Sequence, residues 1–231
     1  MKDEITRNLM AVQQRIMETC TRCGRDSNAV RMIAVTKTVS AETVRVAIQA
    51  GAVLFGENYI QEAREKCGRL AEYPVSWHFI GHLQTNKAKY AVKLFDLIHT
   101  VDSLRLATEL DREARKIGKV QKILIQVNIG KEASKSGIDA ESTEMLIRNL
   151  AAFPNLSVRG LMVIPPFFDE PERVRPHFRG LRELRDSLNN SGIAGVSLDE
   201  LSMGMTGDFE AAIEEGATMV RIGTAIFGER Q

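Results

Sequence analysis

The residues best suited to chemistry in this sequence are polar side chains that stand where short apolar runs end. The set comprises Lys37, Glu57, Asn58, His78, His82, Asp102, Asn128, Ser202 and Arg221. If the apolar runs are parallel strands of a barrel, their carboxyl ends meet on one face and these side chains converge there. A polar residue ends most strands, so each one alone carries little weight. Their common placement is what predicts a site.

Lys37 offers the most distinct chemistry of this group. Counting in steps of two puts Lys37 on the same side of its run as Ile33 and Val35, so its amine would reach the mouth of an apolar enclosure. Partial desolvation disfavours the ammonium form and leaves a nucleophile that can form a Schiff base with an aldehyde. The alternative is a lysine whose amine reaches solvent or pairs with Glu57.

Two glycine-bearing segments near the end of the sequence suit an anion. The first is a loop predicted from Ser202 to Gly207, followed by a helix that Asp208 would cap, and the second places Gly223 and Thr224 at the start of a final helical turn. Backbone N–H groups at a helix start are unpaired, and barrels often bind phosphate between the loops after strands seven and eight. The alternative is that these glycines only form tight turns.

Metal and thiol chemistry fit the sequence less well. Cys20 and Cys23 form a CxxC, but the third thiol, Cys67, has no matching CxxC, whereas a structural zinc site needs four ligands. A redox pair is also disfavoured, because this CxxC ends a predicted helix and does not open one after a strand. His78 and His82 straddle a strand end and a glycine, so they lack the shared helix face of a metal pair. We expect no metal.

The elements that would position these residues alternate between apolar runs and helical patterns. The predicted strands are 31–37, 52–58, 75–81, 97–102, 122–130, 157–165, 197–204 and 218–223. Helical patterns such as 40–51 and 103–118 separate them, each with a serine before its start and a glycine at its end. This alternation favours an α/β fold of parallel strands with helical crossovers, and eight units close a (β/α)₈ TIM barrel. An open doubly wound sheet is the alternative.

Composition limits the function classes. The 231 residues include 31 Lys+Arg and 30 Asp+Glu, and 44% are hydrophobic, as in an ordinary globular protein. A net charge of +1 provides no long-range field for nucleic acid and favours a small ligand. No apolar run approaches the roughly 20 residues that span a bilayer, and the start lacks a signal pattern. We therefore expect a cytoplasmic monomer with no membrane or nucleic-acid partner.

The sequence contains no linker, so we expect one domain over residues 1–231. Its first part would be an N-terminal helix, Glu4 to Cys20, and a turn within residues 1–28, because apolar residues recur there three or four apart. The barrel would occupy residues 31–228.

Seven stretches of the sequence resemble one known family. In order they are AVTKTVS, FGENYIQE, WHFIGHLQTNK, VDS, QVNIGKEASKSG, GLMVIPP and LSMGMTGDFEAAIEEGATMVRIGTAIFG. In order and spacing they are similar to the pyridoxal 5′-phosphate (PLP) homeostasis protein family, a set of single-domain PLP binders. The resemblance runs from about Met32 to Gly228.

The resemblance implies a barrel like the N-terminal domain of alanine racemase, with PLP as an internal aldimine on Lys37. It implies that the phosphate rests on Ser202 and Met203 and on Gly223 and Thr224, and that Arg221 faces the pyridine nitrogen. Asn58 is counted with these residues as a cofactor-binding candidate. The implied role is to bind and buffer PLP and to hand it to PLP-dependent apoenzymes.

Two other function classes remain open at this point. The first is a PLP enzyme such as an amino-acid racemase, although an arginine beside the pyridine nitrogen makes the ring a weaker electron sink. Racemisation also needs a second base, and Tyr59, Tyr73 and Tyr90 cannot be assigned that role from the sequence. The second is a phosphosugar or other phosphate-ligand barrel enzyme, which would leave Lys37 without a defined aldehyde partner.

Overall fold

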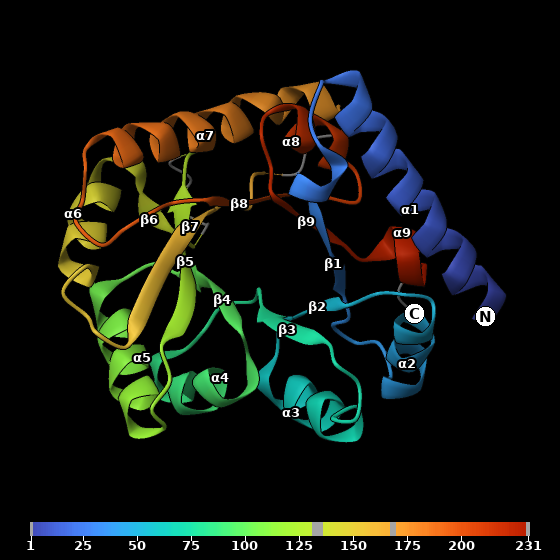
Figure 1. The fold of residues 1–231 in the computed structure, drawn as a ribbon, viewed down its shortest axis with the longest axis horizontal. Helices are drawn as coiled ribbons and strands as arrows, with labels where there is room; N and C mark the ends of the chain where they lie inside the picture. Colours follow the sequence, from blue (N-terminus) through green and yellow to red (C-terminus); the bar gives the residue numbers. More distant parts are fainter. Residues whose placement is uncertain (1, 131–135, 167–169, 230–231) are drawn as a thin grey trace.

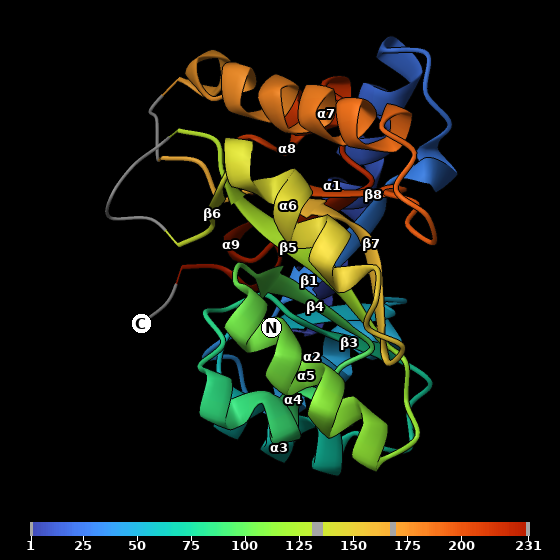
Figure 2. The same cartoon turned by 90° about the vertical axis from the view of Figure 1, so that its left-hand side faces the viewer.

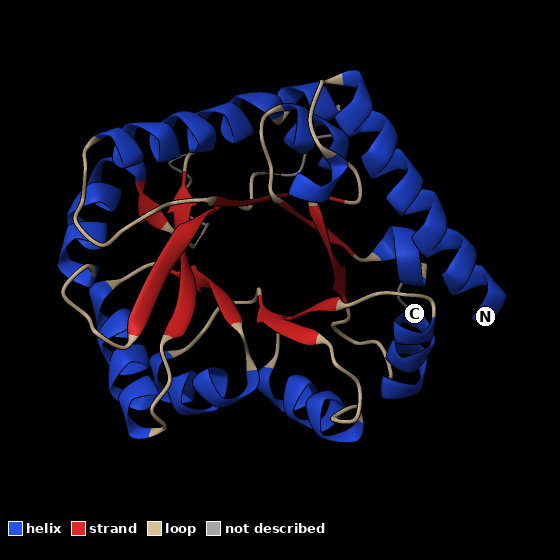
Figure 3. Cartoon of the chain, viewed as in Figure 1, coloured by secondary structure: helices blue, strands red, loops and turns tan. Residues whose placement is uncertain are grey.

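The computed structural model describes residues 2–130, 136–166 and 170–229, and its centre is a closed barrel of parallel strands (Figure 1). The strand order is β4-β3-β2-β1-β9-β8-β7-β5, and a further pairing of β4 with β5 closes the ring. Helices surround this ring (Figure 3). The predicted (β/α)₈ barrel is confirmed, and the open sheet is wrong because both edges of the sheet are paired.

The eight barrel strands match the eight predicted runs. They are β1 (Arg31–Val35), β2 (Leu54–Glu57), β3 (Ser76–Phe79), β4 (Leu97–Val101), β5 (Gln121–Asn128), β7 (Leu156–Met162), β8 (Glu200–Met205) and β9 (Met219–Ile222). Several end before the predicted boundary, so Lys37 and Asn58 follow their strands instead of ending them. A short strand that the sequence pattern did not predict, β6 (Ile138–Asp139), pairs with the end of β5.

The helices lie outside the strands. They are α1 (Lys2–Arg22), α2 (Ala41–Gln49), α3 (Ile60–Arg69), α4 (Ala88–Leu94), α5 (Leu104–Lys116), α6 (Ala140–Leu150), α7 (Arg175–Asn190), α8 (Phe209–Glu214) and α9 (Thr224–Phe227). The described residues also form the short 3₁₀ helices η1 (Ser27–Ala29), η2 (Thr85–Lys87) and η3 (Pro171–Arg173). In Figure 2, α5, α6 and α7 cover the outside of β5 and β7. The N-terminal helix extends beyond the predicted Glu4 to Cys20 at both ends and packs against α2, α8 and α9.

The predicted helix boundaries are confirmed where side chains cap them. The Ser40 hydroxyl accepts from Thr43 N at 3.2 Å, and Ser103 does the same for Leu106 N at 3.4 Å. Gly51 and Gly118 follow the two helix ends with φ of +99° and +64°, the left-handed region in which glycine is favoured. None of the helices in the described part of the chain has an apolar stretch long enough to cross a membrane.

The core has two layers, which follow from the alternation of side chains along each strand. Between the strands and the helices lies a large apolar layer. Inside the barrel lies a smaller apolar cluster of Ile33, Leu97, Leu124, Met162 and Met219. Ile33 of β1 belongs to this inner cluster, and Lys37 follows the carboxyl end of the same strand.

Candidate functional site

A cavity of about 450 Å³ lies at the carboxyl ends of the strands. It is lined by Val35, Lys37, Asn58, Ile80, Ile164, Pro166, Val174, Met205, Thr206, Gly207, Asp208, Arg221, Gly223 and Thr224. Five of the seven predicted cofactor-binding residues line it, and Ser202 and Met203 do not. We call this space the main cavity.

The loop after β1 holds Lys37 from both sides. The Thr36 hydroxyl donates to Glu57 Oε1 at 2.6 Å, and Thr38 N donates to Glu62 Oε2 at 2.7 Å. Thr38 has a φ of 64°, a left-handed conformation that is uncommon for a β-branched residue. The backbone therefore turns sharply directly after Lys37, and the hydrogen bond from Thr38 N to the Glu62 carboxylate holds this turn.

A buried ion pair supports this loop from behind. Lys66 Nζ donates to Glu57 Oε1 at 2.7 Å, to Thr36 O at 2.5 Å and to Glu62 Oε2 at 3.1 Å. Burial raises the pKa of Glu57, and the hydrogen bonds from Lys66 and Thr36 offset only part of that rise. The ion-pair partner of Glu57 is thus Lys66, a residue that the sequence pattern did not single out.

Arg221 brings a buried positive charge to the wall of the main cavity. Its side chain is 4% exposed, Nη1 donates to Ser202 Oγ at 2.7 Å, and Nη2 donates to Val163 O at 2.9 Å. Burial lowers the pKa of Arg221 to about 10, and the charge of Asp208 opposes that shift. Among the described residues, the hydrogen-bond partners of Arg221 are a hydroxyl and a backbone carbonyl, and neither is a carboxylate. The guanidinium of Arg221 is therefore still charged at neutral pH, and it offers donors only.

The loop that was predicted to begin at Ser202 begins later, because Ser202 and Met203 lie within β8. Their contact with a phosphate stays a prediction. β8 continues to Met205, because the pairing of β8 with β9 shifts register between Ser202 and Met205. Gly204 lies in this shift with a φ of +89°, and a Cβ there would be 2.6 Å from the Cβ of Ala212. Ser202 faces the barrel interior and Met203 is buried in the outer apolar layer.

The loop that borders the main cavity begins after these two residues. Met205, Thr206 and Gly207 line the cavity, and Asp208 Oδ1 accepts from Met205 N at 2.5 Å. Asp208 occupies the N-cap position of α8 as predicted, but its side chain closes this turn instead of capping the helix. Burial raises the pKa of Asp208. Gly223 and Thr224 face the loop from the start of α9, as predicted.

Asn58 supplies an amide on a third side. It follows β2, and the backbone of Gly81 packs against it so closely that a Cβ at position 81 would lie 2.3 Å from Asn58 O. Asn58 Oδ1 is buried and has no hydrogen-bond partner in the structure. A buried amide oxygen without a partner, on the wall of a cavity, fits a hydrogen-bond donor of a ligand.

The remaining polar residues predicted at strand ends are dispersed. His78 lies inside the barrel, where its Nδ1 is 3.0 Å from Nε2 of His99, while His82 is exposed. Neither Asp102 nor Asn128 lines the main cavity. His99, fully buried within a predicted strand, is a residue that sequence reasoning missed. The available signal was a histidine inside the run LIHTVD.

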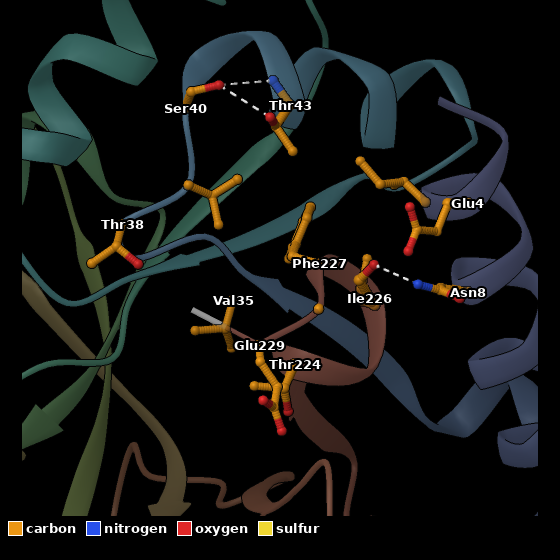
Figure 4. A pocket seen from close by; sticks show the side chains of 14 residues that line it. Glu4, Asn8, Val35, Thr38, Ser40, Thr43, Thr224, Ile226, Phe227 and Glu229 are labelled. Carbon is orange, nitrogen blue, oxygen red and sulfur yellow. Dashed lines mark hydrogen bonds between the residues drawn. The ribbon is translucent and has the colours of Figure 1, made fainter. Parts of the chain in front are cut away.

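A second cavity of about 320 Å³ lies between α1, the start of α2 and α9 (Figure 4). It shares Val35, Gly223 and Thr224 with the main cavity. Hydroxyl groups, apolar side chains and the carboxylates of Glu4 and Glu229 line it. None of its described lining residues is a lysine, an arginine or a histidine. We call this space the side cavity.

Comparisons with known proteins agree with this geometry. Residues 5–231 match the family described as alanine racemase, N-terminal domain. A pyridoxal phosphate homeostasis protein of Aquifex aeolicus is 47% identical over 223 residues, which cover 96% of this chain and 97% of that protein. The structure of PipY from Synechococcus elongatus with PLP bound is 35% identical, with a TM-score of 0.86, and the match covers 97% of this chain and 100% of PipY. An alanine racemase of Clostridium difficile is similar in fold alone, with a TM-score of 0.76 at 15% identity over 99% of this chain and 57% of that protein.

Proposed function

The chain belongs to the pyridoxal phosphate homeostasis protein family, and on this premise we propose that it binds PLP through a Schiff base on Lys37 and holds it for supply to other proteins. The observation that carries the proposal is that Lys37 and Arg221 line one cavity, together with two backbone segments suited to an anion. When bound, PLP supplies an aldehyde, a pyridine nitrogen and a phosphate, and each has a complement among these residues.

Arg221 selects the form of the pyridine ring. Its guanidinium is positive and offers donors only, so a ring nitrogen that faces it must be the acceptor and must lack a proton. A protonated ring would place two positive charges side by side in a buried site, with no anion in hydrogen-bond contact among the described partners of Arg221. Arg221 therefore favours neutral pyridine, the weaker electron sink.

The phosphate fits the segments Met205–Gly207 and Gly223–Thr224. Both line the main cavity, and Arg221 lies on the same wall. The side cavity also reaches Gly223 and Thr224, but its described lining has carboxylates and no lysine, arginine or histidine. In the main cavity the carboxylate of Asp208 is accompanied by the cations Lys37 and Arg221. Charge therefore favours the main cavity for the phosphate.

A carrier fits the cavity better than an amino-acid racemase. Besides Lys37, Asp208 is the described lining residue that could act as a base at neutral pH, and its Oδ1 is engaged by Met205 N in the loop assigned to the phosphate. Tyr59 is 54% exposed, while Tyr73 and Tyr90 pack against the outer apolar layer. A positioned general acid or base contributes about 10² to 10⁴ in rate, and the described lining offers no further candidate besides Lys37 and Asp208. Transfer to PLP-dependent apoenzymes, a monomeric state and a cytoplasmic location remain predictions from the sequence.

An absorbance titration tests the proposal. The protein without cofactor is titrated with PLP, and a Schiff base band near the visible edge should develop to one equivalent. Lys37→Ala should abolish the band, whereas Lys89→Ala, a change of an exposed lysine on α4, should leave it unaltered. A band of full strength in Lys37→Ala would overturn the assignment of Lys37.

The racemase alternative is tested separately. The loaded protein is incubated with each L-amino acid in deuterium oxide, and NMR and chiral chromatography follow the α-proton and the configuration. We expect turnover below about 1 per second for every common amino acid, under the usual enzyme range. A faster rate would make the racemase the leading function.

A further inference from the structure

A chain of four polar side chains crosses the barrel interior behind Arg221. Arg221 Nη1 lies 2.7 Å from Ser202 Oγ, which lies 2.9 Å from Nδ1 of His99, and Nε2 of His99 lies 3.0 Å from Nδ1 of His78. All four residues are buried, and Ser202 and His99 have no exposed surface. The chain joins β9, β8, β4 and β3, and β4 is separated from β8 by β5 and β7. It therefore spans a space that TIM barrels usually fill with aliphatic side chains.

The donors and acceptors of this chain fix one direction for all of its hydrogen bonds. Because arginine only donates, Ser202 Oγ accepts from Arg221. The hydroxyl hydrogen of Ser202 then needs an acceptor, and Nδ1 of His99 lies at the required distance. His99 consequently carries its proton on Nε2 and donates to Nδ1 of His78. In the reverse direction the hydrogen of Ser202 would have no acceptor among its described partners.

The chain is neutral apart from Arg221. Burial lowers the pKa of His78 to about 4 and holds the pKa of His99 well below its ordinary value. Each imidazole therefore has one ring proton at neutral pH, one donor and one acceptor. In the described part of the chain, Arg221 is held by neutral partners, Ser202 and the Val163 carbonyl, and neither of them cancels its charge.

We infer that His99 is a positioning residue, which orients Arg221 through Ser202 and keeps the guanidinium charge directed at the ligand. The ring nitrogen as the target of that charge rests on the proposed function, whereas the orientation of Arg221 does not. Without the acceptor at His99, the Ser202 hydroxyl would rotate freely and one of the two hydrogen bonds that fix the guanidinium plane would weaken.

The first test uses the protein without cofactor. NMR of the Arg221 guanidinium compares wild type with His99→Leu, which removes the acceptor, and with His99→Asn, whose amide oxygen can replace Nδ1. We expect resolved Nη protons in the wild type and in His99→Asn, and rotation at least tenfold faster in His99→Leu. Equal rotation in wild type and His99→Leu would overturn the inference.

The second test separates positioning from a structural role. Affinities are measured for PLP and for its analogue with carbon in place of the ring nitrogen. His99→Leu should weaken PLP about tenfold and the analogue less than twofold, His99→Asn should restore PLP binding, and Leu97→Met, a change inside the same strand, should affect neither. An equal loss of both ligands in His99→Leu would contradict the inference.

Two arrangements keep the tests decisive. If His99→Leu fails to fold, His78→Leu removes only the far end of the chain and should give the same selective loss at a smaller size; an unselective loss in that variant would overturn the inference. If the wild type binds neither ligand, the proposed function fails, and the rotation of Arg221 still decides the role of His99.

Discussion

The main cavity and the side cavity share part of their lining but differ in the charged side chains of the rest. Val35, Gly223 and Thr224 belong to both. On the main side lie Lys37 and Arg221, and a buried hydrogen-bond chain lies behind Arg221. On the side facing α1 lie hydroxyl groups and the carboxylates of Glu4 and Glu229 (Figure 4).

Under the proposed function, the shared backbone does not by itself select the ligand. Gly223 and Thr224 at the start of α9 line both spaces, but only the main cavity has described cationic side chains. The proposed selection therefore depends on residues far apart in sequence that the barrel brings to one cavity. Variants that act on one cavity, or on the wall between them, can break or sharpen this contrast.

The largest effect is expected from the Glu57–Lys66 ion pair, which supports the loop after β1. Lys66→Met would leave the buried carboxylate of Glu57 without its cation, which typically costs about 3–5 kcal/mol of unfolding free energy. Urea unfolding measures this loss, with the exposed Lys93→Met on α4 as a control. A loss below about 1 kcal/mol, the size of an exposed pair, would show that the Glu57–Lys66 pair does not hold the loop.

The next effect concerns Gly223, which lines both cavities. Gly223→Val places a branched side chain next to the N–H groups at the start of α9, so a phosphate cannot approach them closely. Affinity for PLP should fall at least tenfold, about 1.4 kcal/mol, while affinity for pyridoxal should stay within about twofold. Isothermal titration with both ligands measures the contrast. Equal losses would place the phosphate elsewhere.

The free energy of unfolding should depend on pH through His78, which lies in the barrel interior behind Arg221. The folded pKa of His78 is about 4, below its ordinary value of 6.5, so the unfolded chain binds more protons between these values. The stability contribution is complete above pH 6.5 and is lost as the pH falls toward 4, by up to roughly 1.4 kcal/mol per pH unit for each histidine.

The measurement is urea unfolding at pH 7 and pH 5 for wild type and His78→Leu. The variant should lose less stability over this interval than the wild type. The raised pKa values of Glu57 and Asp208 act in the opposite direction, and the comparison with wild type removes their contribution. Identical pH dependence in both proteins would mean that His78 is not held neutral.

The smallest effect is expected in the side cavity. Ile5→Phe adds volume there from α1, because Ile5 lines the side cavity and does not line the main cavity. PLP affinity should change less than twofold, under about 0.4 kcal/mol. A tenfold loss would show that the two cavities act as one site.

Local patterns in the sequence predicted much of this arrangement. Alternating apolar runs gave the barrel, and the spacing of Ile33, Val35 and Lys37 placed the lysine at its mouth. The end of the strand before this loop was missed, because the register shift near Gly204 depends on pairing between β8 and β9. The loop therefore begins after Met205 and not at Ser202.

The buried polar contacts were missed for a related reason. The partner of His99 at Ser202 lies 103 positions away, and Lys66 reads as an ordinary position of an amphipathic helix until the fold brings it to Glu57. Such contacts depend on how distant strands and helices close, and no local pattern encodes them.

The most direct measurement of the central claim is the identity of the lysine that holds the cofactor. The protein is loaded with PLP, reduced with borohydride, digested and analysed by mass spectrometry. The account predicts one reduced adduct, on Lys37, and loss of the band near the visible edge. An adduct on another lysine, with Lys37 unmodified, would contradict it.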